Sequence, residues 1–186
     1  MNIVTEITPN PETLKFKVSK DLLKSNGIEF KRVEDAQENK FIEELFGIDG
    51  VKSIFVGSNF VSITKKTQAV WGQLKAKILI FLVDYLNSHE IIFNEKKIQI
   101  ENDDNNLIKD KTSKKIKDII DAKVRPAVAR DGGDIIFRNF KNGIVYLSLK
   151  GACAGCPSSS ATLKQGIENL LKHYFPEVQS VQEISK

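Results

Sequence analysis

The chemistry available to this chain of 186 residues begins with its only two cysteines, Cys153 and Cys156. With two residues between them, the two thiols can bind one metal ion, form a local disulfide or act as a thiol–disulfide redox pair. Their neighbours in the loop are all small: Gly151, Ala152, Ala154 and Gly155. This small size predicts that both sulfurs are uncovered and that a bulky body can approach them. The spacing alone does not decide among the three chemistries.

The number of ligands restricts the metal chemistry. A zinc site or an iron–sulfur cluster usually takes four protein ligands, and Cys153 and Cys156 supply two. The chain has 2 histidines, His89 and His173. His89 belongs to the first half of the chain, and His173 follows Cys156 on one predicted helix at a distance of roughly 25 Å. Four thiolates therefore require two copies of the loop, most simply about a two-fold axis. Four thiolates suit [2Fe-2S] and [4Fe-4S] clusters alike.

Composition and charge argue against several classes of protein. The 28 basic and 24 acidic residues give a net charge of +4 that is spread along the chain, so we expect no nucleic-acid partner. The longest apolar run, within residues 78–83, is too short to span a membrane, and the N-terminus lacks the pattern of a signal peptide. The sequence therefore predicts a soluble protein without a membrane partner. We expect it in the bacterial cytoplasm, with a processed mitochondrial matrix protein as the alternative.

The first predicted domain, residues 1–88, mixes helices and strands. Alternating apolar and polar residues indicate a strand with one solvent-exposed face at 14–18, and a hairpin over 51–56 and 60–64. Apolar stripes predict helices at 41–46 and 70–85.

Residues 89–111 are predicted to be a linker, because the polar run at 101–106 has no core-forming residue. The apolar triplets at 91–93 and 98–100 could still dock on the first domain.

The second predicted domain, residues 112–186, has the order helix, strand, strand, helix, strand. Thr112 or Ser113 is expected to cap the first helix, and Pro126 to interrupt it. Strands are predicted at 135–139, 144–149 and 178–184, and a helix from Pro157 to Phe175. The fold class is thus α+β, with two small domains joined by a polar linker. The Asp-Gly-Gly-Asp stretch at 131–134 is interpreted as a turn in preference to a metal site, because two aspartates alone bind Ca²⁺ or Mg²⁺ poorly.

The chain resembles the NifU-like (Nfu) iron–sulfur cluster carriers. The resemblance lies in an Arg-Pro pair, the Asp-Gly-Gly-Asp stretch, a Gly-x-Cys-x-x-Cys-Pro-Ser-Ser loop and a Thr-Leu-Lys-x-Gly-Ile-Glu helix, at residues 125–126, 131–134, 151–159 and 162–168. The first domain is similar to the Nfu N-terminal domain at residues 8–16, 45–57, 71 and 74–75. The chain departs from the family pattern at residues 39–42, where relatives often have a Ser-Pro-Leu-type helix entry.

This resemblance implies a carrier that is not an enzyme. Cys153 and Cys156 of two subunits would hold a bridging [4Fe-4S] cluster, with [2Fe-2S] as the alternative cluster. The implied partners are an upstream cluster-assembly scaffold as donor, apo iron–sulfur proteins as recipients, and a second copy of the chain when the cluster is bound. Two other interpretations of the cysteine pair stay open: a thiol–disulfide oxidoreductase and a structural zinc site between subunits. The first domain is expected to recognise partners or to orient the carrier domain.

Overall fold

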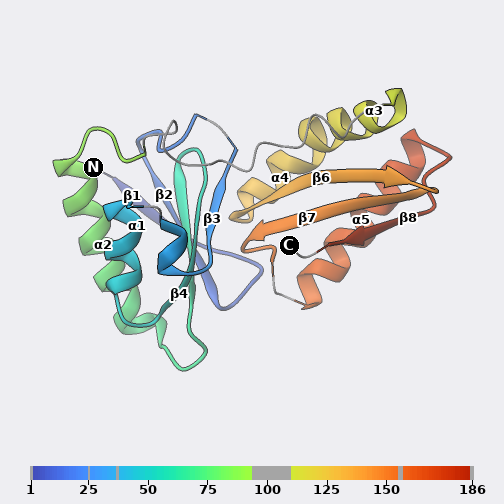
Figure 1. The fold of residues 1–186 in the computed structure, drawn as a ribbon. Coiled ribbons are helices and arrows are strands. Elements are labelled where there is room, and N and C mark those ends of the chain that lie inside the picture. The colour runs from blue at the N-terminus through green and yellow to red at the C-terminus, as the bar shows by residue number, and fades with distance from the viewer. Residues whose placement is uncertain (1, 25, 37, 94–109, 155–156, 185–186) are drawn as a thin grey trace. The chain divides into compact units, whose positions relative to one another are not determined.

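The structure is a computed structural model that describes residues 2–24, 26–36, 38–93, 110–154 and 157–184. The chain divides into two compact units, Met1–Ile100 and Glu101–Lys186. They are coloured blue to green and yellow to red in Figure 1. Each unit combines helices with one sheet, which confirms the predicted α+β class. In the part of the chain that the structure describes, no helix is both long and apolar enough to cross a membrane.

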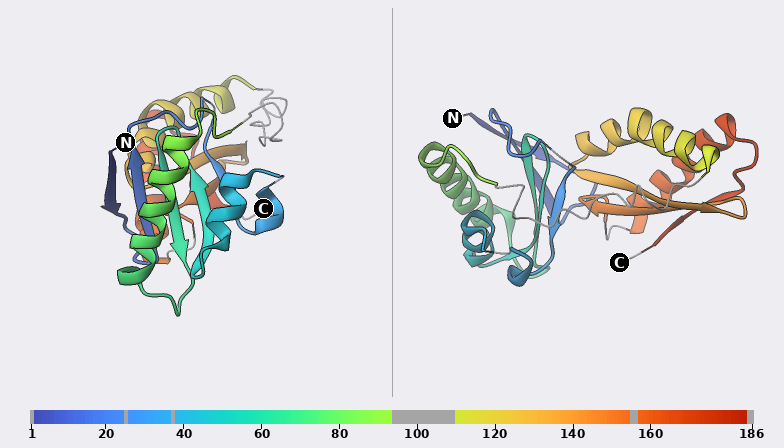
Figure 2. Two further views of the ribbon diagram at one scale, coloured as in Figure 1. Left: turned by 90° about the vertical axis from the view of Figure 1, so that its left-hand side faces the viewer. Right: turned by 45° about the horizontal axis from the view of Figure 1, so that its top comes forward.

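The first unit is a five-stranded antiparallel sheet in the order β1-β2-β5-β4-β3. Its elements are β1 (Ile3–Ile7), β2 (Thr13–Val18), β3 (Ile28–Phe30), a 3-10 turn (Val33–Ala36), α1 (Lys40–Gly47), β4 (Val51–Val56), β5 (Phe60–Lys65) and α2 (Trp71–Ser88). Both helices lie on one face of this sheet (Figures 1 and 2). The predicted hairpin, the strand at 14–18 and the two predicted helices are confirmed, whereas β1 and β3 were not predicted.

β2 has the solvent-exposed face that its alternation predicts at Lys17 but not at Lys15. Lys15 is only 7% exposed. Its Nζ lies 2.9 Å from a carboxylate oxygen of Glu6 on β1 and 4.8 Å from the ring centroid of Phe60 on β5. The prediction is wrong at Lys15 because β2 is an inner strand, so a neighbour on each side covers this side chain.

The core of the first unit continues past the predicted boundary at residue 88. Ile92 and Phe93 are buried, and the rings of Phe93 and Phe41 meet edge to face with centroids 5.8 Å apart. Asn39 caps α1 by accepting a hydrogen bond from the Ile42 N–H (3.2 Å), and its Nδ2 donates to the Ile92 carbonyl (3.1 Å). The segment after α2 thus docks on α1, at the position where the sequence departs from the family pattern.

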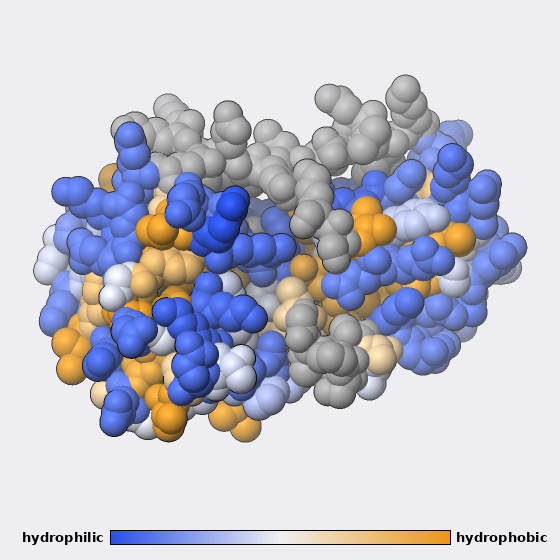
Figure 3. All heavy atoms as spheres, turned by 60° about the horizontal axis from the view of Figure 1, so that its bottom comes forward, coloured by the Kyte–Doolittle hydropathy of each residue, from blue (hydrophilic) through white to orange (hydrophobic). Residues whose placement is uncertain are grey.

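The visible surface is mainly hydrophilic. Figure 3 shows blue side chains over most of this face, and the orange side chains gather most on the first unit. The most exposed large apolar side chains of the described residues belong to this unit: Ile7 (90%), Ile91 (78%) and Val70 (70%). Within the triplet 91–93, the chain therefore buries the last two side chains and leaves the first in solvent.

The second unit contains the predicted order of elements. These are α3 (Lys111–Ile119), a π-helical turn (Ile120–Val124), α4 (Arg125–Arg130), β6 (Gly133–Lys141), β7 (Ile144–Gly151), α5 (Pro157–Tyr174) and β8 (Ser180–Glu183). The sheet order is β6-β7-β8, with β6 and β7 antiparallel and β7 and β8 parallel. Asn142 and Gly143 have positive φ angles (52° and 77°), as a tight hairpin turn requires. The three α-helices, the π-helical turn and all three strands contribute to one apolar core.

The first helix of this unit begins earlier than predicted. Asp110, and not Thr112 or Ser113, is its N-cap: a carboxylate oxygen of Asp110 accepts the Ser113 N–H (2.8 Å) and the other accepts the Ser113 hydroxyl (2.6 Å). These hydrogen bonds from Ser113 hold the pKa of Asp110 below its ordinary value. Ser113 thus donates to the N-cap, Asp110, and is not the cap itself.

Phe93→Ala tests whether the segment after α2 is part of the first unit. We expect a loss of about 3 kcal/mol in the free energy of unfolding of this unit, because the change leaves a cavity beside Phe41. Urea unfolding followed by the fluorescence of Trp71, the only tryptophan of the chain, reports on this unit. Ile91→Ala is the matched control and should cost less than about 0.5 kcal/mol, since Ile91 is exposed. Equal losses in the two variants would contradict the docking of Phe93.

Glu168→Gln tests the contact between α5 and β8. Glu168 accepts hydrogen bonds from the Lys172 side chain (2.6 Å) and from the Val181 N–H (3.0 Å). The Lys172 bond first, and the backbone bond second, lower the pKa of Glu168 below its ordinary value of 4.5. A lowered pKa means that the contribution to stability is fully present above 4.5 and is lost as the pH falls through the folded-state pKa.

We therefore expect Glu168→Gln to be less stable than the wild type at neutral pH, and this difference to shrink as the pH falls below 4.5, the ordinary pKa of the group. Urea unfolding monitored by circular dichroism at neutral and at acidic pH measures the difference. The exposed Glu177 provides the control, because Glu177→Gln should change stability little at either pH. A deficit in Glu168→Gln that stays constant with pH would show that the carboxylate charge is not what holds β8.

Candidate functional site

Cys153 lies in the tight turn that follows β7. The strand ends at Gly151, whose φ angle is 64°, and the Ala154 N–H bonds to the Gly151 carbonyl (3.1 Å). α5 begins at Pro157, as predicted. Cys156 and Gly155 lie outside the described residues, so the structure places one of the two predicted ligands.

Cys153 is covered, and the prediction of an uncovered sulfur is wrong for this residue. It is 6% exposed and belongs to the apolar core of the second unit. The turn folds back on the residues before β6, where the Ala152 N–H donates to the Gly132 carbonyl (3.1 Å). The small neighbours of the cysteine therefore allow the chain to close over the sulfur, where we expected them to leave it open.

Gly132, which precedes β6, and Gly133, the first residue of β6, have different roles. Gly132 has a φ angle of 84°, in the left-handed region that favours glycine, and so makes the turn out of α4. Gly133 provides space: a Cβ added there would lie 2.5 Å from the Lys150 carbonyl oxygen and 2.9 Å from the Cys153 Sγ. The interpretation of 131–134 as a turn agrees with this geometry. The sequence did not predict that Cys153 packs against the same stretch.

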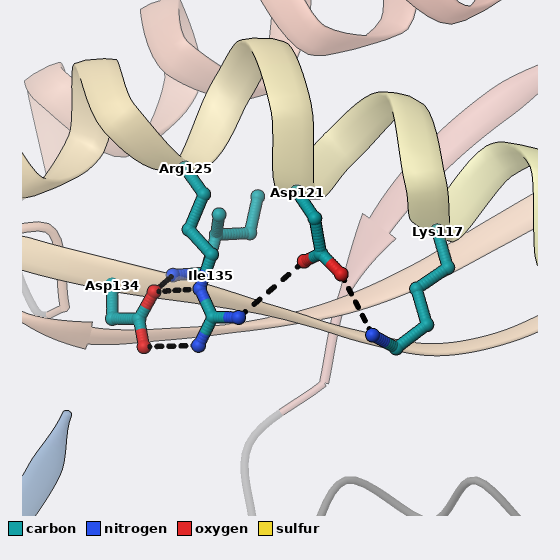
Figure 4. A network of polar contacts seen from close by, with 5 residues as sticks. All are labelled: Lys117, Asp121, Arg125, Asp134 and Ile135. Carbon is teal, nitrogen blue, oxygen red and sulfur yellow. Dashed lines mark hydrogen bonds and ion pairs between the residues drawn. The ribbon is translucent and has the colours of Figure 1, made fainter. Parts of the chain in front are cut away.

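Asp134 forms a bidentate ion pair with Arg125. Arg125 Nε and Nη2 donate to its two carboxylate oxygens at 2.7 and 2.8 Å, and one of these oxygens also accepts the Ile135 N–H (2.8 Å). Arg125 also contacts Asp121 (3.4 Å), which pairs with Lys117 (2.7 Å). Figure 4 shows this row of charges running from the helical segment to the start of β6. A bidentate partner on Asp134 agrees with the choice of a turn over a metal site.

Neither histidine completes a set of ligands. Within the described ranges, no three His, Cys, Asp or Glu side chains come together in a way that could hold a metal ion. His89 is exposed at the end of α2 and stacks on Tyr85 (ring centroids 4.0 Å apart), and His173 is exposed in the last turn of α5. The described residues therefore form no metal site of three or more ligands around Cys153.

Gly133→Ala tests the contact between the glycine backbone and Cys153. We expect a loss of about 2 kcal/mol or more in the free energy of unfolding of the second unit, because the Lys150 carbonyl cannot move away without disturbing the β6–β7 ladder. Hydrogen exchange of the β6 and β7 amides measures this loss.

Gly166→Ala is the matched control for this substitution. Gly166 lies within α5, and a Cβ there would meet nothing within 4 Å. This change should stabilise the unit by about 0.5–1 kcal/mol, because alanine favours helix over glycine. If both alanine variants shift stability in the same direction, the close contact at Gly133 is not what limits that position.

Two family models match the chain. The model described as "Scaffold protein Nfu/NifU N terminal" matches residues 3–89, and the model described as "NifU-like domain" matches residues 116–182. The solution NMR structure of a NifU-like protein from Saccharomyces cerevisiae is similar at 25% identity, covering 51% of this chain and 86% of that one, with a TM-score of 0.47.

Two relatives match almost the whole of this chain. The mitochondrial NFU1 iron-sulfur cluster scaffold homologs of Drosophila willistoni and Drosophila virilis are 40% and 38% identical to this chain over 187 residues. Each alignment covers 99% of this chain, and 64% and 62% of the respective relatives. The chain thus spans somewhat less than two thirds of the length of these relatives. It belongs to the NifU-like (Nfu) family, with an Nfu N-terminal domain followed by a NifU-like domain.

Proposed function

We propose that this protein is a non-enzymatic iron–sulfur cluster carrier. Two copies hold one [4Fe-4S] cluster through Cys153 and Cys156 of each chain and pass it to apo-proteins. Family membership supports an iron–sulfur scaffold role, because the matched relatives are named as such. The observation that carries the bridging arrangement is the shortage of ligands: the described residues hold no group of three metal-binding side chains. A second copy supplies the two missing thiolates.

The buried position of Cys153 bears on how the cluster is held. In the described form the sulfur packs against the Gly133 backbone, so ligation needs the turn at 152–154 to present the sulfur outward. The cost of this local opening partly offsets the iron–sulfur bond. A ligand that regains favourable packing when it lets go suits a carrier, because release to a recipient is then less unfavourable.

Transfer proceeds by ligand exchange. A recipient thiolate forms a new bond to iron while the bond from iron to Cys153 or Cys156 breaks. The recipient thiol gives up its proton when it binds iron, and the departing cysteine takes up a proton, so the protons balance. Each sulfur keeps its oxidation state, and no electron is gained or lost. Thiolates are the exchanging species, which makes the process dependent on thiol ionisation in the recipient.

The remaining parts of the proposal concern partners and location. An upstream assembly scaffold is the donor, apo iron–sulfur proteins are the recipients, and the first unit contributes to partner recognition. The matched relatives are named mitochondrial, which fits a processed mitochondrial matrix protein. The bacterial cytoplasm is the other compartment in this proposal.

Anaerobic reconstitution with iron and sulfide tests the proposal. We expect the wild-type chain to gain visible absorption and about four iron ions per two chains, in a species with the mass of a dimer. Cys153→Ser and Cys156→Ser should each lower the bound iron by about tenfold or more, since each removes one thiolate from both chains. Ala154→Ser is the control, because it adds the same hydroxyl to the loop but leaves both cysteines in place.

Other outcomes would contradict the proposal in different ways. A single chain that carries a complete cluster without an added thiol would refute the bridging arrangement. A colourless monomer that reduces disulfides without iron would identify an oxidoreductase. Tightly bound zinc that iron does not replace would identify a structural site, and about two iron ions per dimer would indicate [2Fe-2S].

A further inference from the structure

Arg125 binds the stretch that packs on Cys153. It lies where the π-helical turn meets α4. Between α3 and α4 the chain forms a π turn, in which the Arg125 N–H bonds to the Ile120 carbonyl. Pro126 follows directly and has no N–H to donate, so the regular pattern of α-helical bonds cannot pass through it. A π turn inserts an extra residue and rotates the side chains that follow. Arg125 lies at this change of helix type.

The contact between Arg125 and Asp134 is a paired, partly buried interaction. The guanidinium donates to both carboxylate oxygens at 2.7 and 2.8 Å (Figure 4). The side chain of Arg125 is 20% exposed and that of Asp134 is 7% exposed, so little water competes for the pair. Two parallel charge-assisted hydrogen bonds fix the orientation of both groups, which one ammonium group cannot do.

The same carboxylate is linked to the cysteine through the backbone. Asp134 also accepts the Ile135 N–H, so its own backbone is fixed where β6 begins. The preceding residue, Gly133, lies against the Cys153 Sγ, and the residue before that, Gly132, accepts the Ala152 N–H. A displacement of Asp134 therefore moves the two peptide groups that contact the cysteine turn.

We propose that Arg125 is a positioning residue for Cys153. Its bidentate hold on Asp134 keeps the Gly132–Gly133 backbone against the turn and so sets how readily the sulfur leaves its packed position. The described link from Arg125 to the sulfur of Cys153 runs through Asp134 and the Gly132–Gly133 backbone. The effect of Arg125 on cluster transfer rests on the proposed function. Its effect on how readily the Cys153 sulfur leaves its packed position is a property of the cluster-free chain.

Labelling of Cys153 in the cluster-free protein tests the proposal. In a Cys156→Ser background Cys153 is the only thiol, and its rate of reaction with iodoacetamide reports how often the sulfur becomes accessible. Arg125→Lys keeps the positive charge beside Asp134 but loses the forked geometry. We expect this variant to label at least about fivefold faster than its parent, because local opening becomes easier. Asp134→Asn, which breaks the pair from the other side, should act in the same direction.

Two controls separate positioning from general loss of stability. Val128→Ala removes buried volume from α4 without touching the ion pair, and it shows how much labelling follows from destabilisation alone. Lys117→Gln breaks the ion pair at the outer end of the charge row and should label like the parent. The free energy of unfolding of each variant is measured under the same conditions.

The labelling rates, compared with the measured stabilities, can support or overturn the role of Arg125. Labelling of Arg125→Lys that exceeds the level expected from its stability, with Val128→Ala as the reference, supports the proposal. Labelling at or below that level overturns it, and so does an equal increase in Lys117→Gln. If the wild type fails to bind a cluster, the proposed function fails while the labelling result still decides the role of Arg125. If the cluster binds, a longer cluster lifetime in Arg125→Lys supports the same conclusion, because the packed position that competes with ligation is weakened.

Discussion

The contact between the Gly133 backbone and Cys153 is the constraint on which the second unit is built. No side chain fits between them, because a Cβ at Gly133 would reach both the cysteine sulfur and the carbonyl of Lys150. Gly133 also pairs with Gly151 across the β6–β7 ladder, so glycine occurs on both strands at the same level. The sheet can therefore end close to the cysteine turn, and the start of β6 becomes part of the sulfur's surroundings.

This constraint changes the physical picture of the proposed carrier. Small residues around two cysteines predict an open loop, yet the structure packs Cys153 into the core. Opening and ligation are then coupled, because the sulfur must give up its contacts before it can bind iron. The ion pair between Arg125 and Asp134 belongs to the same arrangement, since it ties the start of β6 to the helical segment. Retention and release of a cargo would depend on both the iron–sulfur bonds and this packing.

Local sequence signals predicted the elements that form from neighbouring residues. The β4–β5 and β6–β7 hairpins, the helices and the presence of a last strand follow from turn residues and apolar spacing. The parallel pairing of that strand with β7 was not predicted. β1 and β3 were missed because they are edge strands whose identity depends on pairing with β2 and β4. The first helix cap was misassigned because Asp110 and Ser113 both have the residue types of a cap, and only the hydrogen bonds distinguish them.

In the candidate site, too, features set by the local sequence could be predicted and features set by tertiary contacts could not. The cysteine pair and its ligand shortage could be predicted, because they require only residue counts and spacing. The burial of Cys153 could not, since it depends on a glycine from a strand earlier in the chain. Consecutive glycines between two aspartates were the available signal, but a turn explains them as well as a close contact does. Arg125 and Asp134 are similarly separated by a helix end and a turn, and their pairing is a tertiary event.

The parallel pairing of β7 with β8 has a consequence for the order of events during synthesis. A parallel neighbour cannot join by a hairpin, so β8 must wait until α5 has been made and has crossed the sheet. Val181, which is 1% exposed, enters the core only with that last strand. A nascent chain on the ribosome therefore has its cysteine loop translated while one side of the sheet is still unpaired. The thiol of Cys153 is therefore accessible to solvent, and to oxidants or metal ions in it, until this unit has folded.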